Sequence, residues 1–350
     1  MDLQTCLDYL KNYNGEEVSF MEVCGSHTEA IAKSGIKTII SDKIHLVSGP
    51  GCPVCVSPSG YVDKLVELAF SKDTVVATFG DMMRVPGSKG SLNDAAGQGA
   101  DVTMVYSPMD VIKLAEESPD KTFVFAAVGF ETTIPVYTLL LDHVVANDIK
   151  NIKLLTALKV MPPIIDWLCA NNANVDGFIA PGHVSVITGS DYYIGLSKKH
   201  KIPFSVSGFK PEELVIGIYG LLKMWENKDT PDYKLVRNFY PSVVTAEGNA
   251  EAKRQINKYF TPAKARWRGI GDVDDSGLYL REEYLCYDAG SFNLDSDIKL
   301  NKACRCGDVL MGKIDSTECP LFGKLCTPTN PEGACMVSTE GSCYVKAITK

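Results

Sequence analysis

Short runs of β-branched and aromatic residues recur along the first two thirds of the chain, roughly every 25–30 residues, which is the length of one strand plus one helix. The runs do not alternate cleanly between apolar and polar residues, as is typical of parallel strands buried on both faces. A loop with Gly or Pro and then a helical pattern follow most of them. Eight strands are predicted, at Val18–Val23, Ile44–Val47, Thr74–Phe79, Val102–Tyr106, Thr122–Val128, Lys153–Leu158, Gly177–Ala180 and Phe204–Val206.

This spacing predicts an α/β fold with two related, mainly parallel α/β domains that face a central cleft. Four strands precede residue 118 and four follow it, so we expect a first domain over residues 1–118 and a second over 119–230. Residues 231–350 then hold a helical return and a small Cys-rich domain. Helices are expected at Glu212–Trp225 and Ala246–Tyr259, and the stretch Gly269–Gly277, rich in Gly and Asp, is expected to be a loop.

The charge of the chain bears on its partners. A formal net charge of −8 and a pI near 5.3 argue against nucleic acid or an anionic membrane as the main partner. No apolar run approaches membrane-spanning length, and the chain start has no basic region followed by an apolar core. We therefore expect a cytoplasmic protein. Because structural disulfides are rare in a reducing compartment, its twelve cysteines indicate metal binding or redox chemistry.

Six of these cysteines fall within the last part of the chain, where few apolar residues are periodic and Gly, Pro and Cys dominate. Such a segment needs a covalent or metal staple. Thiols without nearby histidines favour an iron–sulfur cluster or zinc. Cys304 and Cys306, two apart in an extended chain, are expected to point to opposite sides. The six are Cys304, Cys306, Cys319, Cys326, Cys335 and Cys343.

Loops that follow parallel strands converge at one edge of a sheet, where ligands bind. If the two halves face each other, residues from several such loops share one cleft. These are Cys24, Cys52, Cys55, Asp81, Arg84, Glu131 and His183. Gly and Pro in such loops are also common turn residues, and His183, Arg84 and Glu131 each have a purely structural interpretation.

Cys24 lies at a strand end and helix start, where the helix N-terminus is expected to stabilise a thiolate, and His27 follows one turn later. The segment SGPGCPVC places Cys52 and Cys55 at the spacing of redox dithiols. Three interpretations are open for the pair: a turn with incidental thiols, a zinc site completed by Cys24 and His27, or a dithiol switch. A helix starting near Ser57 favours the switch modestly.

Six motifs in order (EVCGSHT, SGPGCPVC, FGDMMRVPG, VGFETT, APGHVS and the tail CRCGDVL with ECPLFGKLCTP and GACMVSTEGSC) resemble the HypD family of hydrogenase maturation factors. The resemblance runs from about residue 20 to the C-terminus. Glu318 stands where the family pattern would have Asp before Cys319.

The resemblance implies a scaffold on which the iron centre of [NiFe]-hydrogenase, with cyanide and carbon monoxide ligands, is built. It implies two α/β domains and an iron–sulfur domain, and as partners a HypC-type chaperone and a HypE-type cyanide donor. Cys24 would ligate the nascent iron with a HypC cysteine, Cys52 and Cys55 would be redox-active, and His27 and Glu131 would assist them. Cys304, Cys319, Cys326 and Cys343 would hold a [4Fe-4S] cluster, which leaves Cys306 and Cys335 as a neighbouring thiol–disulfide pair.

Two rival functions remain at this stage. One is a binding scaffold whose cysteines hold structural zinc, and the other is a stand-alone thiol–disulfide reductase. Metal analysis separates a zinc protein, which is colourless, from a brown protein with a cluster.

Overall fold

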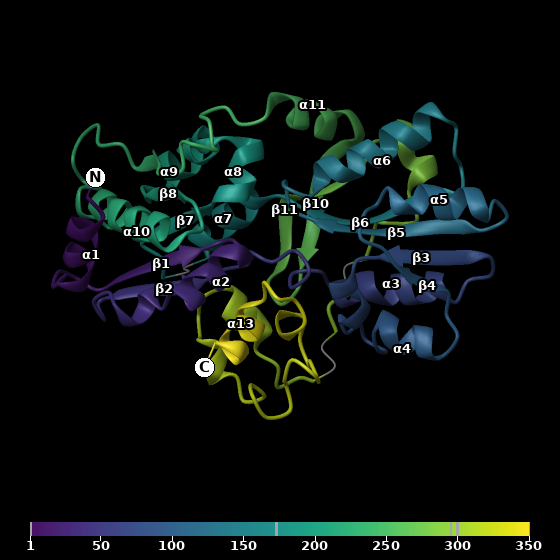
Figure 1. Ribbon diagram of the computed structural model, residues 1–350, viewed down its shortest axis with the longest axis horizontal. Coiled ribbons are helices and arrows are strands. Elements are labelled where there is room, and N and C mark those ends of the chain that lie inside the picture. The colour runs from purple at the N-terminus through teal and green to yellow at the C-terminus, as the bar shows by residue number, and fades with distance from the viewer. Residues whose placement is uncertain (1, 172–173, 295, 299–300, 350) are drawn as a thin grey trace.

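The computed structural model describes residues 2–171, 174–294, 296–298 and 301–349, and two sheets organise it (Figure 1). The first sheet is entirely parallel, with the strand order β2 (Ile44–Ser48), β1 (Val18–Glu22), β7 (Gly177–Pro181), β8 (Phe204–Ser207) and β9 (Val236–Asn238). The second has the order β10 (Phe260–Trp267), β11 (Gly271–Leu280), β6 (Ile152–Lys159), β5 (Thr122–Gly129), β3 (Thr74–Thr78) and β4 (Val102–Met104).

Helices connect and cover the strands. The α-helices are α1 (Leu3–Lys11), α2 (Gly25–Ser34), α3 (Ser59–Ala69), α4 (Leu92–Gly97), α5 (Asp110–Glu117), α6 (Ile134–Ala146), α7 (Met161–Ala170), α8 (Gly182–Thr188), α9 (Ile194–His200), α10 (Pro211–Glu226), α11 (Ala250–Tyr259), α12 (Cys306–Leu310) and α13 (Ser342–Ile348). The 3-10 helices are η1 (Ile36–Thr38), η2 (Gly80–Arg84), η3 (Ser190–Tyr193), η4 (Glu282–Tyr287), η5 (Ser316–Glu318) and η6 (Ala334–Met336).

The α/β class and all eight predicted strands are confirmed, but β9, β10 and β11 were not predicted. The expectation of a loop over Gly269–Gly277 is wrong, because β11 covers most of it and pairs antiparallel with β10. Gly269 and Gly271, with φ of 71° and 122°, form the turn of this hairpin. The Asp residues that resembled a loop face solvent on a strand whose other side is buried.

The sheet pairings cut across the expected boundary at residue 118. β1 pairs with β2 on one side and with β7 on the other, so the first sheet combines strands from both predicted domains. The chain leaves this sheet after β2, builds β3 to β6 in the second sheet, and returns with β7. Strand length and spacing do not encode which parallel strands become neighbours, because each crossover connection permits several pairings.

The two sheets and the Cys-rich tail (residues 304–349) meet in one apolar core. This core joins Met21 and Phe178 of the first sheet, Trp267 of the second and the six tail cysteines. Figure 1 shows the tail, in yellow, below and between the sheets. Within the described residues, no helix combines the length and the apolarity that a membrane crossing requires.

Candidate functional site

Cys24 lies beside the Cys52–Cys55 turn because β1 and β2 are parallel neighbours. The loops that leave these strands are joined by backbone hydrogen bonds, from Gly49 N–H to the Glu22 carbonyl (2.8 Å) and from Gly25 N–H to the Gly51 carbonyl (3.0 Å). A Cβ atom on Gly51 would overlap the backbone of Cys24, so the close approach requires glycine there. The predicted proximity of the three cysteines is thus present.

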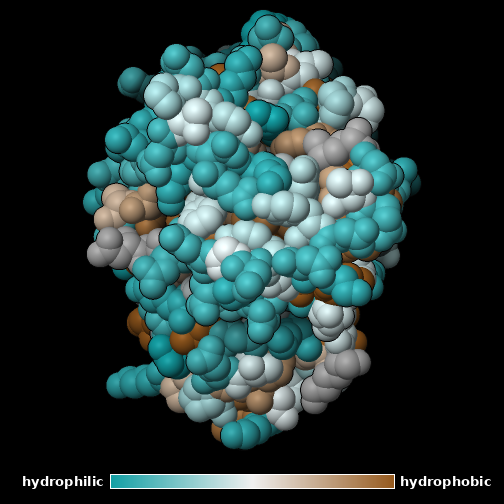
Figure 2. Space-filling view, turned by 90° about the vertical axis from the view of Figure 1, so that its left-hand side faces the viewer, coloured by the Kyte–Doolittle hydropathy of each residue, from teal (hydrophilic) through white to brown (hydrophobic). Residues whose placement is uncertain are grey.

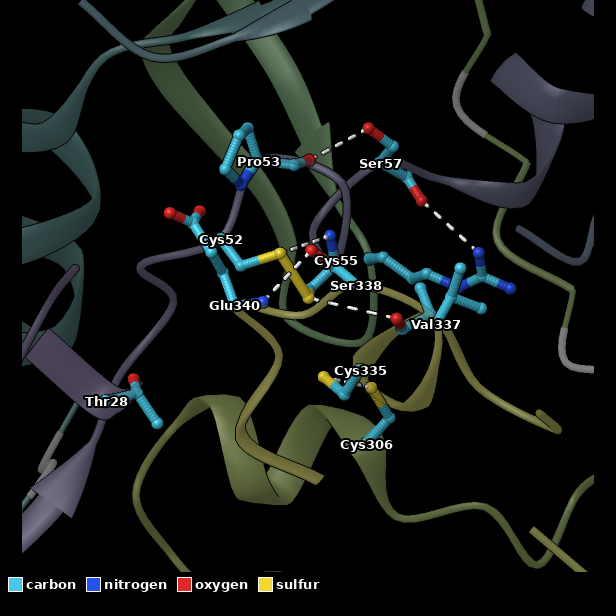
Figure 3. Close-up of a disulfide and its surroundings, with 12 residues drawn as sticks. Thr28, Cys52, Pro53, Cys55, Ser57, Cys306, Cys335, Val337, Ser338 and Glu340 are labelled. Carbon is cyan, nitrogen blue, oxygen red and sulfur yellow. Dashed lines mark hydrogen bonds between the residues drawn. A yellow bond between two sulfur atoms is a disulfide. The ribbon is translucent and has the colours of Figure 1, made fainter. Parts of the chain in front are cut away.

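Cys52 and Cys55 form a disulfide, with Cα atoms 5.3 Å apart (Figure 3). The turn between them is held by the Cys55 N–H, which donates to the Cys52 sulfur at 3.2 Å, and by the Ser57 hydroxyl, which donates to the Pro53 carbonyl at 3.0 Å. Helix α3 begins directly afterwards, at Ser59, as expected. Both cysteines are buried. In this disulfide the two sulfurs are bonded to each other, so they are not available as two zinc ligands.

Cys24 is the N-cap residue of α2, yet its thiol is not acidic. Burial raises its pKa to about 12, and the carboxylates of Glu22 and Glu340 add to this effect. Backbone hydrogen bonds from His27 and Ser26 lower the pKa of Cys24, but burial raises it by more. The expectation of a thiolate stabilised by the helix N-terminus is therefore wrong for the free protein, because desolvation penalises the charged form more than the helix end favours it. A metal cation bound to Cys24 would supply the positive charge that stabilises a buried thiolate.

His27 directs its Nε2 toward the end of β8. Its Nε2 lies 3.2 Å and 3.0 Å from the carbonyl oxygens of Ser207 and Gly208, so Nε2 carries the hydrogen. Nδ1 is buried and has no hydrogen-bond partner among the described residues. Burial lowers the pKa of His27 to about 4. The imidazole is therefore neutral at physiological pH, with an unused lone pair in the interior.

An aromatic ring connects the two histidines predicted from the strand-end loops. The Phe209 ring stacks against His183 with centroids 4.1 Å apart and lies 4.5 Å from His27. His183 lies on α8, which follows β7. The loops after β1, β7 and β8 therefore meet around the Phe209 ring, as expected at the carboxyl ends of parallel strands. Phe209 itself was missed by the sequence analysis, because a single aromatic residue carries no positional signal.

Glu131 is a fully buried acid at the other sheet. Its Oε1 accepts hydrogen bonds from Met161 N–H (2.8 Å) and the Tyr192 hydroxyl (3.2 Å), while Oε2 is buried without a partner in the described residues. Burial raises the pKa of this carboxyl to about 7. The neighbouring Tyr193 experiences the charges of both Glu131 and Cys24, which raise its pKa together with the larger effect of burial. Glu131 therefore belongs to the same buried region as Cys24.

Replacing Glu131 with Gln should change how stability depends on pH. The pKa of Glu131 is 4.5 in the unfolded chain and about 7 in the folded protein. At pH values between these two, the folded protein binds the proton of Glu131 more tightly than the unfolded chain does, so the free energy of unfolding falls as the pH rises. Glu131→Gln removes that dependence. Urea unfolding from about pH 5 to pH 8 should show the variant gaining up to about 3 kcal/mol relative to the wild type. The exposed Glu116→Gln serves as control, and a pH-independent difference for Glu131→Gln would contradict the assignment.

Asp81 and Arg84 lie on η2, and the structure gives Arg84 a structural contact. Its guanidinium donates to the carbonyls of Pro328 (3.3 Å) and Val337 (3.1 Å) and thereby ties the Cys-rich tail to the second sheet. Asp81 is half-buried, and its charge contributes, after burial, to the raised pKa of Glu340. His183 acts on the same carboxyl in the opposite direction. The charges of Asp81 and His183 therefore lie within electrostatic range of Glu340.

Glu340 is a site residue that the sequence analysis missed. Its carboxylate accepts the Ser26 hydroxyl at 2.9 Å, and a Cβ on Gly25 would overlap its side chain. Figure 3 places it beside the disulfide. Glu340 lies in the motif STEGSC, where an acid near a cysteine carries no positional signal of its own. Glu340 brings a charge from the tail against the loop that carries Cys24.

The six tail cysteines line one small cavity together with Phe322, Gly333 and Met336. The expectation that Cys304 and Cys306 point apart is wrong, because Cys306 begins α12 and the chain is not extended there. The sulfurs of Cys306 and Cys335 lie 2.8 Å apart. Figure 3 shows this pair on the side to which Cys55 points, and the Cys55 sulfur lies 3.8 Å from the Ala334 carbonyl oxygen. The remaining four thiols surround the same space.

This donor set fits an iron–sulfur cluster by its chemistry. Thiols alone converge on the cavity, and the Glu332 N–H lies 3.4 Å from the Cys326 sulfur, the kind of amide contact that tunes a cluster. In the described ranges, no three Cys, His, Asp or Glu side chains stand close enough to hold a single metal ion. The zinc site that was one of three interpretations of the cysteine pair, completed by Cys24 and His27, is not formed among these residues, since His27 faces carbonyl oxygens and the pair is a disulfide.

The chain is similar to known proteins over most of its length. The chain is 39% identical over 337 residues to the hydrogenase maturation factor HypD of Escherichia coli K12, covering 95% of this chain and 89% of that protein. It is 37% identical to the HypD of Cupriavidus necator (94% and 89% covered) and 38% identical to that of Rhizobium leguminosarum (93% and 86%). The HypD family model, described as "Hydrogenase formation hypA family", matches residues 3–348. The chain therefore belongs to the HypD family.

Proposed function

We propose that this protein acts in hydrogenase maturation as the scaffold on which the iron centre of [NiFe]-hydrogenase is assembled. Membership of the HypD family supports the general role. The observation that carries the specific role is the junction of three thiol groups: Cys24, the Cys52–Cys55 disulfide, and the six-cysteine cavity. Backbone hydrogen bonds join the loop of Cys24 to the Cys52–Cys55 turn. The Cys55 sulfur contacts the carbonyl oxygen of Ala334, which precedes Cys335 of the cavity.

Cys24 is the ligand that we assign to the incoming iron. Iron with cyanide and carbon monoxide ligands prefers soft thiolates. Because the thiol is protonated in the free protein, iron binding must release its proton, and the buried thiolate then has a counter-charge. A cysteine of a HypC-type chaperone would supply a second thiolate. Because burial lowers the pKa of His27 to about 4, the neighbouring imidazole would stay neutral, and the released proton would leave to solvent or to the partner.

The Cys52–Cys55 pair supplies the electrons for cyanide transfer. A thiocyanate on a HypE-type donor must gain two electrons before its carbon leaves sulfur as cyanide. The reduced pair provides both: its two thiols become the disulfide, the donor sulfur becomes a thiol, and the second proton is released as cyanide binds iron. Atoms and charge therefore balance with one dithiol for each cyanide. The structure contains this pair in its oxidised form.

Cys304, Cys319, Cys326 and Cys343 would hold a [4Fe-4S] cluster, which supplies single electrons when bound. Cys306 and Cys335 would then form the neighbouring thiol pair. Both line the cavity, and Cys335 directly follows Ala334, whose carbonyl oxygen lies 3.8 Å from the Cys55 sulfur, which supports a relay toward the site at Cys24.

We expect about four iron and four sulfide per chain in anaerobically purified protein. Replacing any one of Cys304, Cys319, Cys326 or Cys343 with Ala should lower iron content and visible absorbance to near zero, because the cluster loses a thiolate ligand. Cys169→Ala is the matched control, since Cys169 lies outside the cavity. A colourless protein with one zinc would instead support the zinc scaffold.

The proposed function as a whole is tested by infrared spectroscopy of the chain purified with its HypC-type chaperone. Absorption by iron-bound cyanide and carbon monoxide is the expected result. A complex that cycles its disulfide but carries no such bands would instead indicate a thiol–disulfide reductase.

A further inference from the structure

A cavity of about 450 Å³ lies between α2, the edge strand β2 and the Cys-rich tail, outside the cysteine site. We call it the β2 groove. Its walls include Leu46 to Ser48 of β2, Lys37 of η1, and Lys313 and Lys346 of the tail. Figure 2 views this side of the molecule and shows brown hydrophobic surface where the lower lobe joins the body. None of the steps proposed above uses this groove.

The groove exposes the unpaired edge of a sheet. β2 is the outermost strand, with β1 as its neighbour on the inner side. Val18 N–H bonds to the Lys43 carbonyl and Gly49 N–H to the Glu22 carbonyl, so the odd-numbered residues of β2 face β1. The backbone groups of Leu46 and Ser48 therefore point outward. They form no backbone hydrogen bond to another segment of the described chain.

The charges in the groove favour an anionic occupant. Its acids are already engaged: Glu22 accepts the Cys24 N–H, Asp315 pairs with Lys346 at 3.2 Å, and Glu318 accepts the Asp315 N–H at 2.7 Å. Lys37 and Lys313 line the same groove and form no ion pair in the part of the chain that the structure describes. Desolvation lowers the pKa of the Lys37 ammonium, and the charges of Glu22 and Asp315 offset this effect only in part.

We propose that the β2 groove binds an extended acidic peptide of a partner protein, which adds to β2 as a further strand of the first sheet. Strand addition would satisfy the outward backbone groups of Leu46 and Ser48, and acidic side chains would reach Lys37 and Lys313. At about 3.3 Å per residue, a segment of roughly four to six residues spans the edge. The apolar wall formed by Leu46 and Val47 suits β-branched residues in alternation with the acids. The inference is independent of the iron chemistry.

The test uses a fluorescein-labelled hexapeptide of alternating valine and glutamate with the full-length protein. Fluorescence anisotropy should show saturable binding, and hydrogen exchange should show slower exchange at Leu46 and Ser48. A peptide with N-methylated alternate amides keeps its charge but cannot complete the strand, so it should bind at least about tenfold more weakly. Lys37→Glu/Lys313→Glu should weaken binding of the parent peptide by a similar factor, while retaining the far-ultraviolet circular dichroism of the wild type.

Lys11→Glu/Lys198→Glu is the matched control, because it makes the same charge change at exposed lysines outside the groove. This control should leave binding unchanged. Equal binding of the N-methylated peptide, or its displacement by inorganic phosphate alone, would overturn strand addition and indicate a simple anion site. Absence of binding with no exchange protection at β2 would overturn the proposal altogether. A change in oligomeric state without peptide would assign the edge to a second copy instead.

Discussion

Replacing Cys24 with Ala is expected to abolish the infrared bands of iron-bound cyanide and carbon monoxide in the complex with the HypC-type chaperone. Cys24 lies in the loop directly after β1, and this loop lies against the Cys52–Cys55 turn. The fold and the tail cavity should persist, because Cys24 provides no side-chain cap to α2 and lies outside that cavity. Infrared difference spectra and iron content, measured on the same sample, provide the result.

Cys169→Ala controls for the loss of a single thiol and should keep the bands. Chaperone binding by Cys24→Ala needs a separate measurement, by co-purification, so that loss of iron is not confused with loss of the partner. Normal bands in a Cys24→Ala complex that retains its chaperone would refute the ligand assignment.

The second large effect is expected for Cys52→Ser/Cys55→Ser. This double variant should bind the chaperone but fail to support hydrogenase maturation, because the two electrons for each cyanide are no longer available. The disulfide closes a loop with a sequence separation of only 3, so its removal should cost little stability. Hydrogenase activity in cells that depend on this protein gives the functional readout.

Thiol counting makes this result specific to the redox pair. The wild type should gain two alkylatable thiols on mild reduction, and the double variant none from this pair. Iron and sulfide content should stay at the wild-type level in both. Undiminished maturation by the double variant would show that the electrons come from elsewhere, and metal released on oxidation of the wild-type pair would favour a zinc clamp.

Much of the local structure was predictable from the sequence, because it depends on short-range physics. The run from Thr122 to Val128 is apolar, contains β-branched residues and is short, which favours a buried strand. The positions of the loops follow from the ends of such strands. The tail cysteines were recognisable by number alone. β10 and β11 were not predicted, because a hairpin whose solvent-exposed side is rich in Asp has the composition of a loop.

The acid–base properties of the site were not predictable from the sequence. A helix N-terminus next to Cys24 indicated an acidic thiol, yet burial reverses the direction of its pKa shift. Glu131 and His27 acquire their unpartnered buried atoms only when loops from different strands surround them. Desolvation depends on all neighbours at once, and a linear sequence does not specify those neighbours.

The sequence by itself determined eight of the described strands, the cysteine motifs and, through these motifs, the family. Only the tertiary structure decided that β1 pairs with both β2 and β7, which brings Cys24, the Cys52–Cys55 turn and the β7 and β8 loops to one place. It also placed Glu340 and the six-cysteine cavity against that site. The physical reason is that hydrophobic periodicity records which residues are buried, whereas the choice of neighbour depends on how whole surfaces pack together.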